Sequence, residues 1–118
     1  MSFIRPPAVA GQFYPNNPSE LSSAIITLLR NSKVKIDTSP KAIVAPHAGL
    51  IYSGPIAASA YAQIQAAKKI IKRVVILGPC HRVAVNGLAL CSAKAFQTPL
   101  GNVKIDTKSQ ARIINEPT

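Results

Sequence analysis

The sequence is poor in several residue types that define particular classes of protein. It has no Trp, three Tyr and three Phe, and its two cysteines are too few for a disulfide framework in a chain of 118 residues. No run of 18 apolar residues occurs, and the N-terminal residues lack the apolar core of a signal peptide. We therefore expect a protein of the reducing cytoplasm, with no membrane as a partner.

Acidic residues are also scarce, with four Asp and Glu against fourteen Lys and Arg and a net charge of +10. Such a balance is typical of proteins whose partners carry negative charge, above all proteins that bind nucleic acids. The one basic cluster, Lys68, Lys69, Lys72 and Arg73, lies at the end of an expected helix, where cations interact favourably with the helix dipole. No RNA-binding aromatic signature accompanies it. We expect no nucleic-acid partner; the charge also fits a chain whose acidic counterparts lie elsewhere in a larger protein.

Apolar residues make up 47% of the chain and are mainly aliphatic, which suits a largely parallel sheet flanked by helices, the α/β class. We expect one domain over residues 1–118, with an irregular, proline-rich lead-in over 1–16 and an α/β core portion over 17–118. Capping residues, apolar spacing and apolar runs predict the following elements in order: a helix from Asn17 to near Asn31, a strand over Lys41–Ala45, a helix from Pro55 to about Ala67, and a strand over Arg73–Leu77. Together the last three form a βαβ unit.

The last third of the chain has a different pattern, with short apolar stretches between turn signals. It predicts a strand over Leu88–Ser92, a short strand near Phe96, a turn over 99–102 and a strand over Val103–Ile105. Asp106 is placed to cap a last helix.

The two histidines of the chain, His47 and His81, each follow an apolar run that ends in proline. Ligands of open α/β sheets bind at the carboxyl ends of the strands, and neutral imidazole is a common metal ligand. The pattern favours a metal site, against the alternative of two partly buried histidines bonded to backbone.

A catalytic metal generally needs three or more protein ligands, and the histidines supply two. Cys80 is in principle a candidate for the third ligand. It is next to His81, however, and neighbouring side chains in an extended segment point apart, so we prefer to interpret Cys80 as a small residue that fills a tight turn. Cys91 is expected in the core, and Tyr52 is a candidate substrate contact. No nucleophile elbow, Walker loop or dinucleotide fingerprint is present.

Four segments in this order resemble the motifs of the Memo family, called AmmeMemoRadiSam system protein B in prokaryotes. Residues 5–15 (RPPAVAGQFYP) resemble its opening signature, and residues 45–54 (APHAGLIYSG) resemble its APHAGYxYSG motif. Residues 77–82 (LGPCHR) resemble its LGPxHH motif, and residues 98–101 (TPLG) with Asp106 fit its TPLG segment. The resemblance covers nearly the whole chain.

The resemblance implies a fold like that of the class III extradiol dioxygenases, which are non-haem iron enzymes. It implies that His47 and His81 are metal ligands and that a cysteine from the C-terminal half of the family domain completes the site. Neither Cys80 nor Cys91 matches that cysteine. Family members are considerably longer, so we expect this chain to be the N-terminal part of the domain and to need the remainder for a complete fold.

Two positions depart from the motif: Arg82 stands where a second histidine is usual, and Cys80 where Ser, Thr or Asn is common. With Tyr52, they are our candidates for substrate contact or for tuning the metal. Three functions remain open at this point. One is a metal protein that binds iron or copper, with a redox role and an unknown reaction in the intact protein. The others are a non-catalytic module that binds a peptide or small molecule, and a fragment without independent activity.

Overall fold

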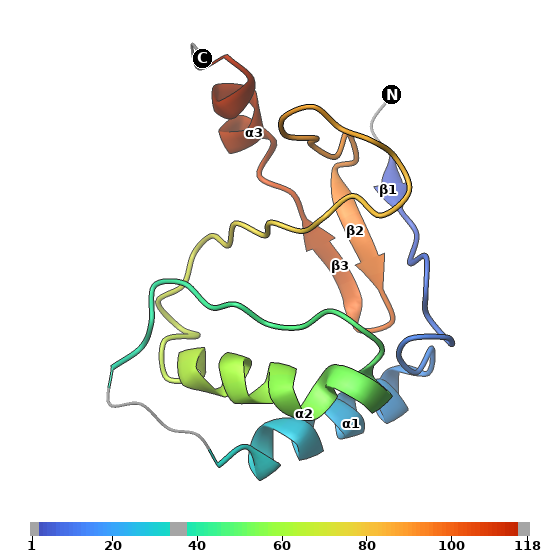
Figure 1. Ribbon diagram of the computed structural model, residues 1–118, viewed down its shortest axis with the longest axis vertical. Helices are drawn as coiled ribbons and strands as arrows, with labels where there is room; N and C mark the ends of the chain where they lie inside the picture. Colours follow the sequence, from blue (N-terminus) through green and yellow to red (C-terminus); the bar gives the residue numbers. More distant parts are fainter. Residues whose placement is uncertain (1–2, 34–37, 116–118) are drawn as a thin grey trace.

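A computed structural model describes residues 3–33 and 38–115 as a mixed α/β structure, in which two helices pack together beside a small sheet (Figure 1). The remaining residues of the expected single domain, 1–2, 34–37 and 116–118, lie outside the described residues. The elements in chain order are β1 (Ile4–Arg5), α1 (Pro18–Asn31), α2 (Leu50–Tyr61), the 3-10 turn η1 (Ala62–Ile64), β2 (Ala95–Thr98), β3 (Gly101–Lys104) and α3 (Thr107–Ile114). The α/β class predicted from the sequence is confirmed.

Helix α1 begins and ends where the sequence predicts. The Asn17 side chain accepts hydrogen bonds from the backbone amides of Ser19 (2.9 Å) and Glu20 (3.1 Å), which have no partner inside the helix. Pro18 occupies the first turn, where a missing N–H costs nothing. Leu21 is buried, so it fixes which face of the helix turns inward.

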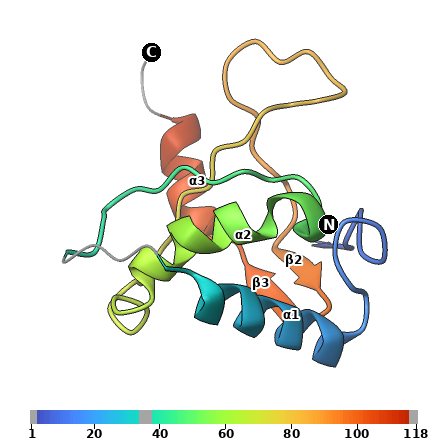
Figure 2. The ribbon, with the colours of Figure 1, turned by 60° about the horizontal axis from the view of Figure 1, so that its bottom comes forward.

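Helix α2 begins at Leu50, five positions before the predicted start at Pro55. The Gly49 carbonyl accepts from the amides of Tyr52 (2.9 Å) and Ser53 (3.0 Å), so the first turn forms on the glycine and Pro55 lies inside the helix. Figure 2 shows α2 lying along α1. A Cβ on Gly54 would lie 2.9 Å from Cδ1 of Leu28, so the two helices approach each other through a residue without a side chain.

The sheet has the order β1-β2-β3 and is mostly antiparallel. Strand β2 pairs with β1 in parallel over two residues and with β3 antiparallel over four. A tight turn joins β2 and β3: Thr98 Oγ1 donates to the Gly101 carbonyl (2.8 Å), and Gly101 has a φ of +120°. The strand predicted near Phe96 is confirmed, and β3 begins two residues before the strand predicted at Val103.

The expectation of a largely parallel sheet is wrong for the described residues, because its main strands do not form. The runs predicted as strands over Lys41–Ala45, Arg73–Leu77 and Leu88–Ser92 are irregular. Their apolar side chains are largely exposed, and no backbone–backbone hydrogen bond among the described residues involves 72–93. A strand forms only where another strand satisfies its amides and carbonyls, and within residues 3–33 and 38–115 these runs have no such neighbour.

Candidate functional site

The structure brings the two histidines together, although 34 positions separate them in sequence. Their Nε2 atoms lie 3.1 Å apart, and the ring centroids are 5.3 Å apart with the ring planes tilted by 52°. His47 comes from the irregular segment that precedes α2, and His81 from the long segment that follows it (Figure 1). Both side chains are exposed. The pair is therefore open to a ligand from solvent.

The segment that carries His47 is anchored by the proline-rich lead-in. The Leu50 amide donates to the Phe13 carbonyl (2.8 Å), and a Cβ on Gly49 would lie 3.4 Å from the same carbonyl oxygen. On the other side, the Ser53 hydroxyl donates to the Ala48 carbonyl (2.9 Å). These contacts fix the backbone directly after His47. The lead-in thus has a positioning role that the sequence analysis missed when it treated residues 1–16 as irregular; its family signature was the available signal.

The segment that carries His81 has contacts with other described elements near its two ends. At the start, Arg73 Nε forms an ion pair of 3.1 Å with Asp106 Oδ2, and at the end the Lys94 amide donates to the Phe3 carbonyl (2.9 Å). Between them residues 74–90 are exposed, and the one side-chain interaction of that stretch with another described residue is the contact of His81 with His47.

Asp106 performs the capping role that the sequence predicts. Its carboxylate accepts hydrogen bonds from the Ser109 amide (3.0 Å) and hydroxyl (2.8 Å). These bonds, with a smaller contribution from Arg73, lower the pKa of Asp106 below its ordinary value. The ionised carboxylate therefore joins the start of the His81 segment to the start of α3.

The other candidate residues do not join the histidine pair. Tyr52 is exposed on the first turn of α2 with its ring beside Gly49, and Cys80 and Arg82 are exposed on either side of His81. No hydrogen bond or ring contact links these three to the imidazoles in the described part of the chain. Cys91 is half-buried and a free thiol. Within residues 3–33 and 38–115, no group of three or more His, Cys, Asp and Glu side chains is placed to hold a metal.

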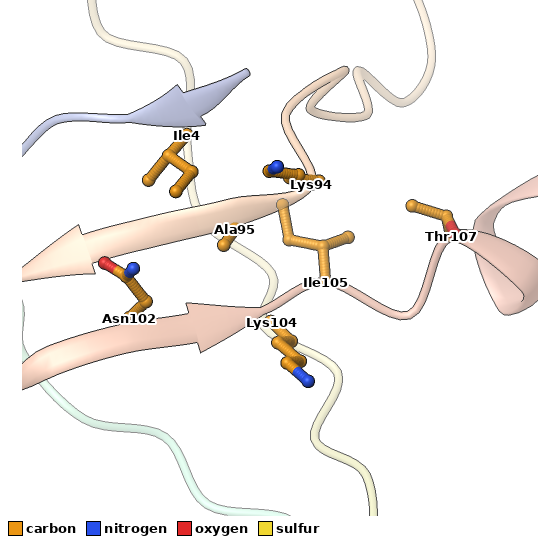
Figure 3. A pocket seen from close by; sticks show the side chains of 7 residues that line it. All are labelled: Ile4, Lys94, Ala95, Asn102, Lys104, Ile105 and Thr107. Atoms are coloured by element: carbon orange, nitrogen blue, oxygen red, sulfur yellow. The ribbon is translucent and has the colours of Figure 1, made fainter. Parts of the chain in front are cut away.

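A pocket lies elsewhere, over the sheet, and contains none of the predicted site residues. It is lined by Ile4, Lys94, Ala95, Asn102, Lys104, Ile105 and Thr107 (Figure 3). Its floor is aliphatic, and the Lys104 amino group points away from Ile4 (Figure 3). Its lining contains no His, Cys, Asp or Glu side chain that could act as a metal ligand or a catalytic base. Among the described residues, no helix is long and apolar enough to cross a membrane.

Comparison with known proteins places this sequence in a family. The family model described as "Memo-like protein" matches residues 5–118. A MEMO1 family protein of Aquifex aeolicus is 40% identical over 114 residues, which are 97% of this chain and 41% of that protein. The MEMO1 family protein MHO1 of Saccharomyces cerevisiae is 41% identical, over 88% of this chain and 31% of the yeast protein. The Caenorhabditis elegans protein named "Protein memo-1 homolog" is 38% identical, over 84% of this chain and 27% of its own length.

This chain thus spans less than half the length of the curated relatives it matches. The family model covers almost every residue, including both histidine motifs and the lead-in that anchors the first of them. The chain therefore belongs to the Memo family.

Proposed function

We propose that the Memo domain represented by this chain binds a redox metal ion, iron or copper, through Nε2 of His47 and Nε2 of His81. The observation that carries the proposal is the 3.1 Å separation of these two atoms. Imidazole nitrogens at neighbouring positions around one ion, each bonded at about 2.1 Å, lie roughly 3.0–3.4 Å apart. The histidine pair fits this spacing.

The arrangement also suits the chemistry of the ligands. Both side chains are exposed, so the imidazoles can present their Nε2 lone pairs to an ion, with the proton of each ring on Nδ1. Imidazole binds iron and copper, and the exposure of both side chains would leave room for further ligands on a bound ion. When bound, such an ion supplies redox chemistry toward an oxygen species or a substrate.

The two imidazoles are part of a ligand set that at least one further member completes in the intact domain. The described residues hold no third His, Cys, Asp or Glu in reach. The family resemblance implies a cysteine that matches neither Cys80 nor Cys91. We therefore assign any redox activity to the intact domain, with His47 and His81 as the contribution of this chain. Tyr52, Cys80 and Arg82 are exposed and are our candidates for contact with a substrate.

The same distance supports a second function, a non-catalytic module for a peptide or small molecule. Two neutral imidazoles 3.1 Å apart also form an N–H···N hydrogen bond, in which one Nε2 donates and the other accepts. In that arrangement one Nε2 lone pair is used internally. The pair then presents its Nδ1 atoms to a ligand and has no requirement for metal.

An anaerobic titration with Fe(II) and, separately, with Cu(II) distinguishes the two functions. Calorimetry on the 118-residue chain is expected to show one ion bound per chain, with Cu(II) tighter than Fe(II), following the general order of affinities for nitrogen sites. His47→Ala and His81→Ala should each weaken binding by about tenfold or more, since each removes one of two ligands.

The matched control is Asn86→Ala, which alters an exposed residue of the same segment as His81 and leaves both imidazoles intact. It should bind metal as the unaltered chain does. Circular dichroism must first show that all variants keep their helices. A folded chain that binds neither ion, or binds equally with and without the histidines, contradicts the proposal and favours the non-catalytic module.

A further inference from the structure

The described lining of the pocket over the sheet includes two lysines and no acidic side chain (Figure 3). None of the residues proposed for the metal site takes part in it. The pocket has a volume of about 360 Å³, which lies within the range of pockets that hold small molecules, roughly 300–1,000 Å³. A pocket of this size, separate from the histidine pair, is a candidate site for a ligand of its own.

The register of the strands places apolar and polar side chains of the pocket on one face of the sheet. Ala95 pairs with Ile4 on one side and with Lys104 on the other, and residues directly opposite each other on neighbouring strands share a face. Asn102 lies two positions before Lys104 on β3, so it shares that face as well. Ala95 is buried. The pocket therefore has an aliphatic floor with an ammonium group and an amide along its edge.

Lys94 contributes a second ammonium group to the pocket. Its backbone is held by two hydrogen bonds, one from its amide to the Phe3 carbonyl (2.9 Å) and one from the Ile105 amide to its carbonyl (3.0 Å). Figure 3 shows the Lys94 side chain pointing toward Ile4, whereas the Lys104 amino group points away from it. The four-carbon stem of a lysine is flexible, so the Lys104 amino group can turn toward a ligand in the pocket.

Within residues 3–33 and 38–115, neither pocket lysine has a counter-charge. The ion pair found there joins Arg73 to Asp106. Asp106 precedes the pocket residue Thr107, but its carboxylate already accepts hydrogen bonds from Ser109 and pairs with Arg73. Two ammonium groups on neighbouring segments repel each other, and an anion between them offsets that repulsion. The net charge of +10 also attracts anions to the chain as a whole. Charge therefore selects an anionic ligand.

We propose that this pocket binds a small aliphatic carboxylate, with the carboxylate group between the amino groups of Lys94 and Lys104 and the hydrocarbon chain on the aliphatic floor. Ammonium groups donate charge-assisted hydrogen bonds to a carboxylate, and burial of the hydrocarbon chain adds to the affinity. An inorganic anion satisfies only the first requirement, and a neutral alcohol only the second. A free acid and the C-terminus of a polypeptide both present this chemistry. Binding here uses neither histidine and requires no metal.

Titration of the 118-residue chain with hexanoate, followed by NMR in the presence of a chelator, tests the proposal. We expect saturable shifts of the Ala95 methyl group and the Asn102 side-chain amide. Hexanol, which has no charge, and inorganic phosphate, which has no hydrocarbon chain, should each bind at least about tenfold more weakly. An acetylated tripeptide that ends in leucine distinguishes the two sources: tighter binding than hexanoate assigns the site to a polypeptide C-terminus, and weaker binding assigns it to a free acid.

Two double variants with the same change in net charge locate the site. Lys94→Met/Lys104→Met removes both ammonium groups and should weaken hexanoate binding about tenfold. Lys68→Met/Lys69→Met alters residues outside the pocket lining and should leave binding within about twofold, since distant exposed charges are screened. All four side chains are exposed, so neither variant is expected to unfold the chain.

The proposal is overturned if hexanoate does not bind, if hexanol or phosphate binds as tightly as hexanoate, or if the two double variants behave alike. Because a chelator is present, failure of metal binding at the histidine pair leaves this result unaffected.

Discussion

The helix pair and the histidine-bearing segments are built from equally apolar sequence but reach different states. In α1 and α2, hydrogen bonds are local, and each helix covers part of the other through Leu28 and Gly54. In the segments 38–47 and 72–92, the aliphatic runs are largely exposed, and no backbone–backbone hydrogen bond joins them to another described residue. A helix satisfies its own backbone, whereas a strand depends on a neighbour that another part of the chain must supply. Apolar composition alone therefore does not decide what folds.

The largest expected effect is a loss of stability that differs between the two regions because their side chains differ in burial. Leu21→Ala removes a side chain that is 5% exposed and should lower the free energy of unfolding by about 2–4 kcal/mol. Val75→Ala, at a residue that is 80% exposed, should change it by less than about 0.5 kcal/mol. Urea unfolding followed by circular dichroism measures both. Equal losses for the two variants would show that the Val74–Leu77 run is packed in solution, and would break the comparison.

A smaller effect tests the local origin of α1. Asn17→Ala removes the acceptor for the amides of Ser19 and Glu20 and should cost about 1 kcal/mol of stability. Asn31→Ala, at the other end of the same helix, makes a matched control, since its side chain is exposed and forms no hydrogen bond with another described residue. The same urea unfolding applies. A cap variant that is as stable as the control would mean that packing, rather than capping, sets the start of the helix.

The smallest expected effect is the dependence of α3 on pH through Asp106. This residue caps α3 and pairs with Arg73 at the start of the His81 segment. Its pKa is lowered by the Ser109 hydrogen bonds and, to a smaller extent, by Arg73, so the carboxylate form is the one that stabilises α3. This stabilisation is complete above the ordinary carboxyl pKa and is lost as the pH falls through the lowered value. The amide resonances of Ser109 and Ala111 should therefore shift toward disordered values only as the pH falls below the ordinary pKa of an Asp carboxyl.

Asp106→Asn provides the control for that titration, because an amide oxygen keeps the cap without an ionisable group. The variant should show no such shift between neutral and acid pH. If its α3 resonances move with pH as those of the unaltered chain do, the titration belongs to another group.

The sequence predicts elements well where the determining contacts lie within a few residues. Asn17 and Pro18 place the start of α1, and Asp106 places the start of α3, because each cap acts on amides two or three positions away. Pro55 misled the prediction for α2, since the Gly49 carbonyl accepts the first-turn bonds earlier and the helix accommodates the proline. The strands at 41–45 and 73–77 did not form, because strand formation depends on a neighbour that residue patterns cannot supply.

In the candidate site too, the sequence predicted what depends on local patterns and missed a contact between distant segments. Two apolar runs that end in a proline and a histidine were enough to single out His47 and His81, and the structure brings their rings into contact. The anchoring of Gly49 and Leu50 by the Phe13 carbonyl was not foreseen, because it joins segments with no shared pattern. The expected roles of Tyr52, Cys80 and Arg82 stay predictions.

The central claim is that the Nε2 atoms of His47 and His81 bind one metal ion. Electron paramagnetic resonance of the chain loaded with one equivalent of Cu(II) tests it most directly, because nitrogen hyperfine splitting counts the imidazole ligands. We predict two coupled imidazoles in the unaltered chain and one in either His47→Ala or His81→Ala. A spectrum that is the same in all three proteins would contradict the claim.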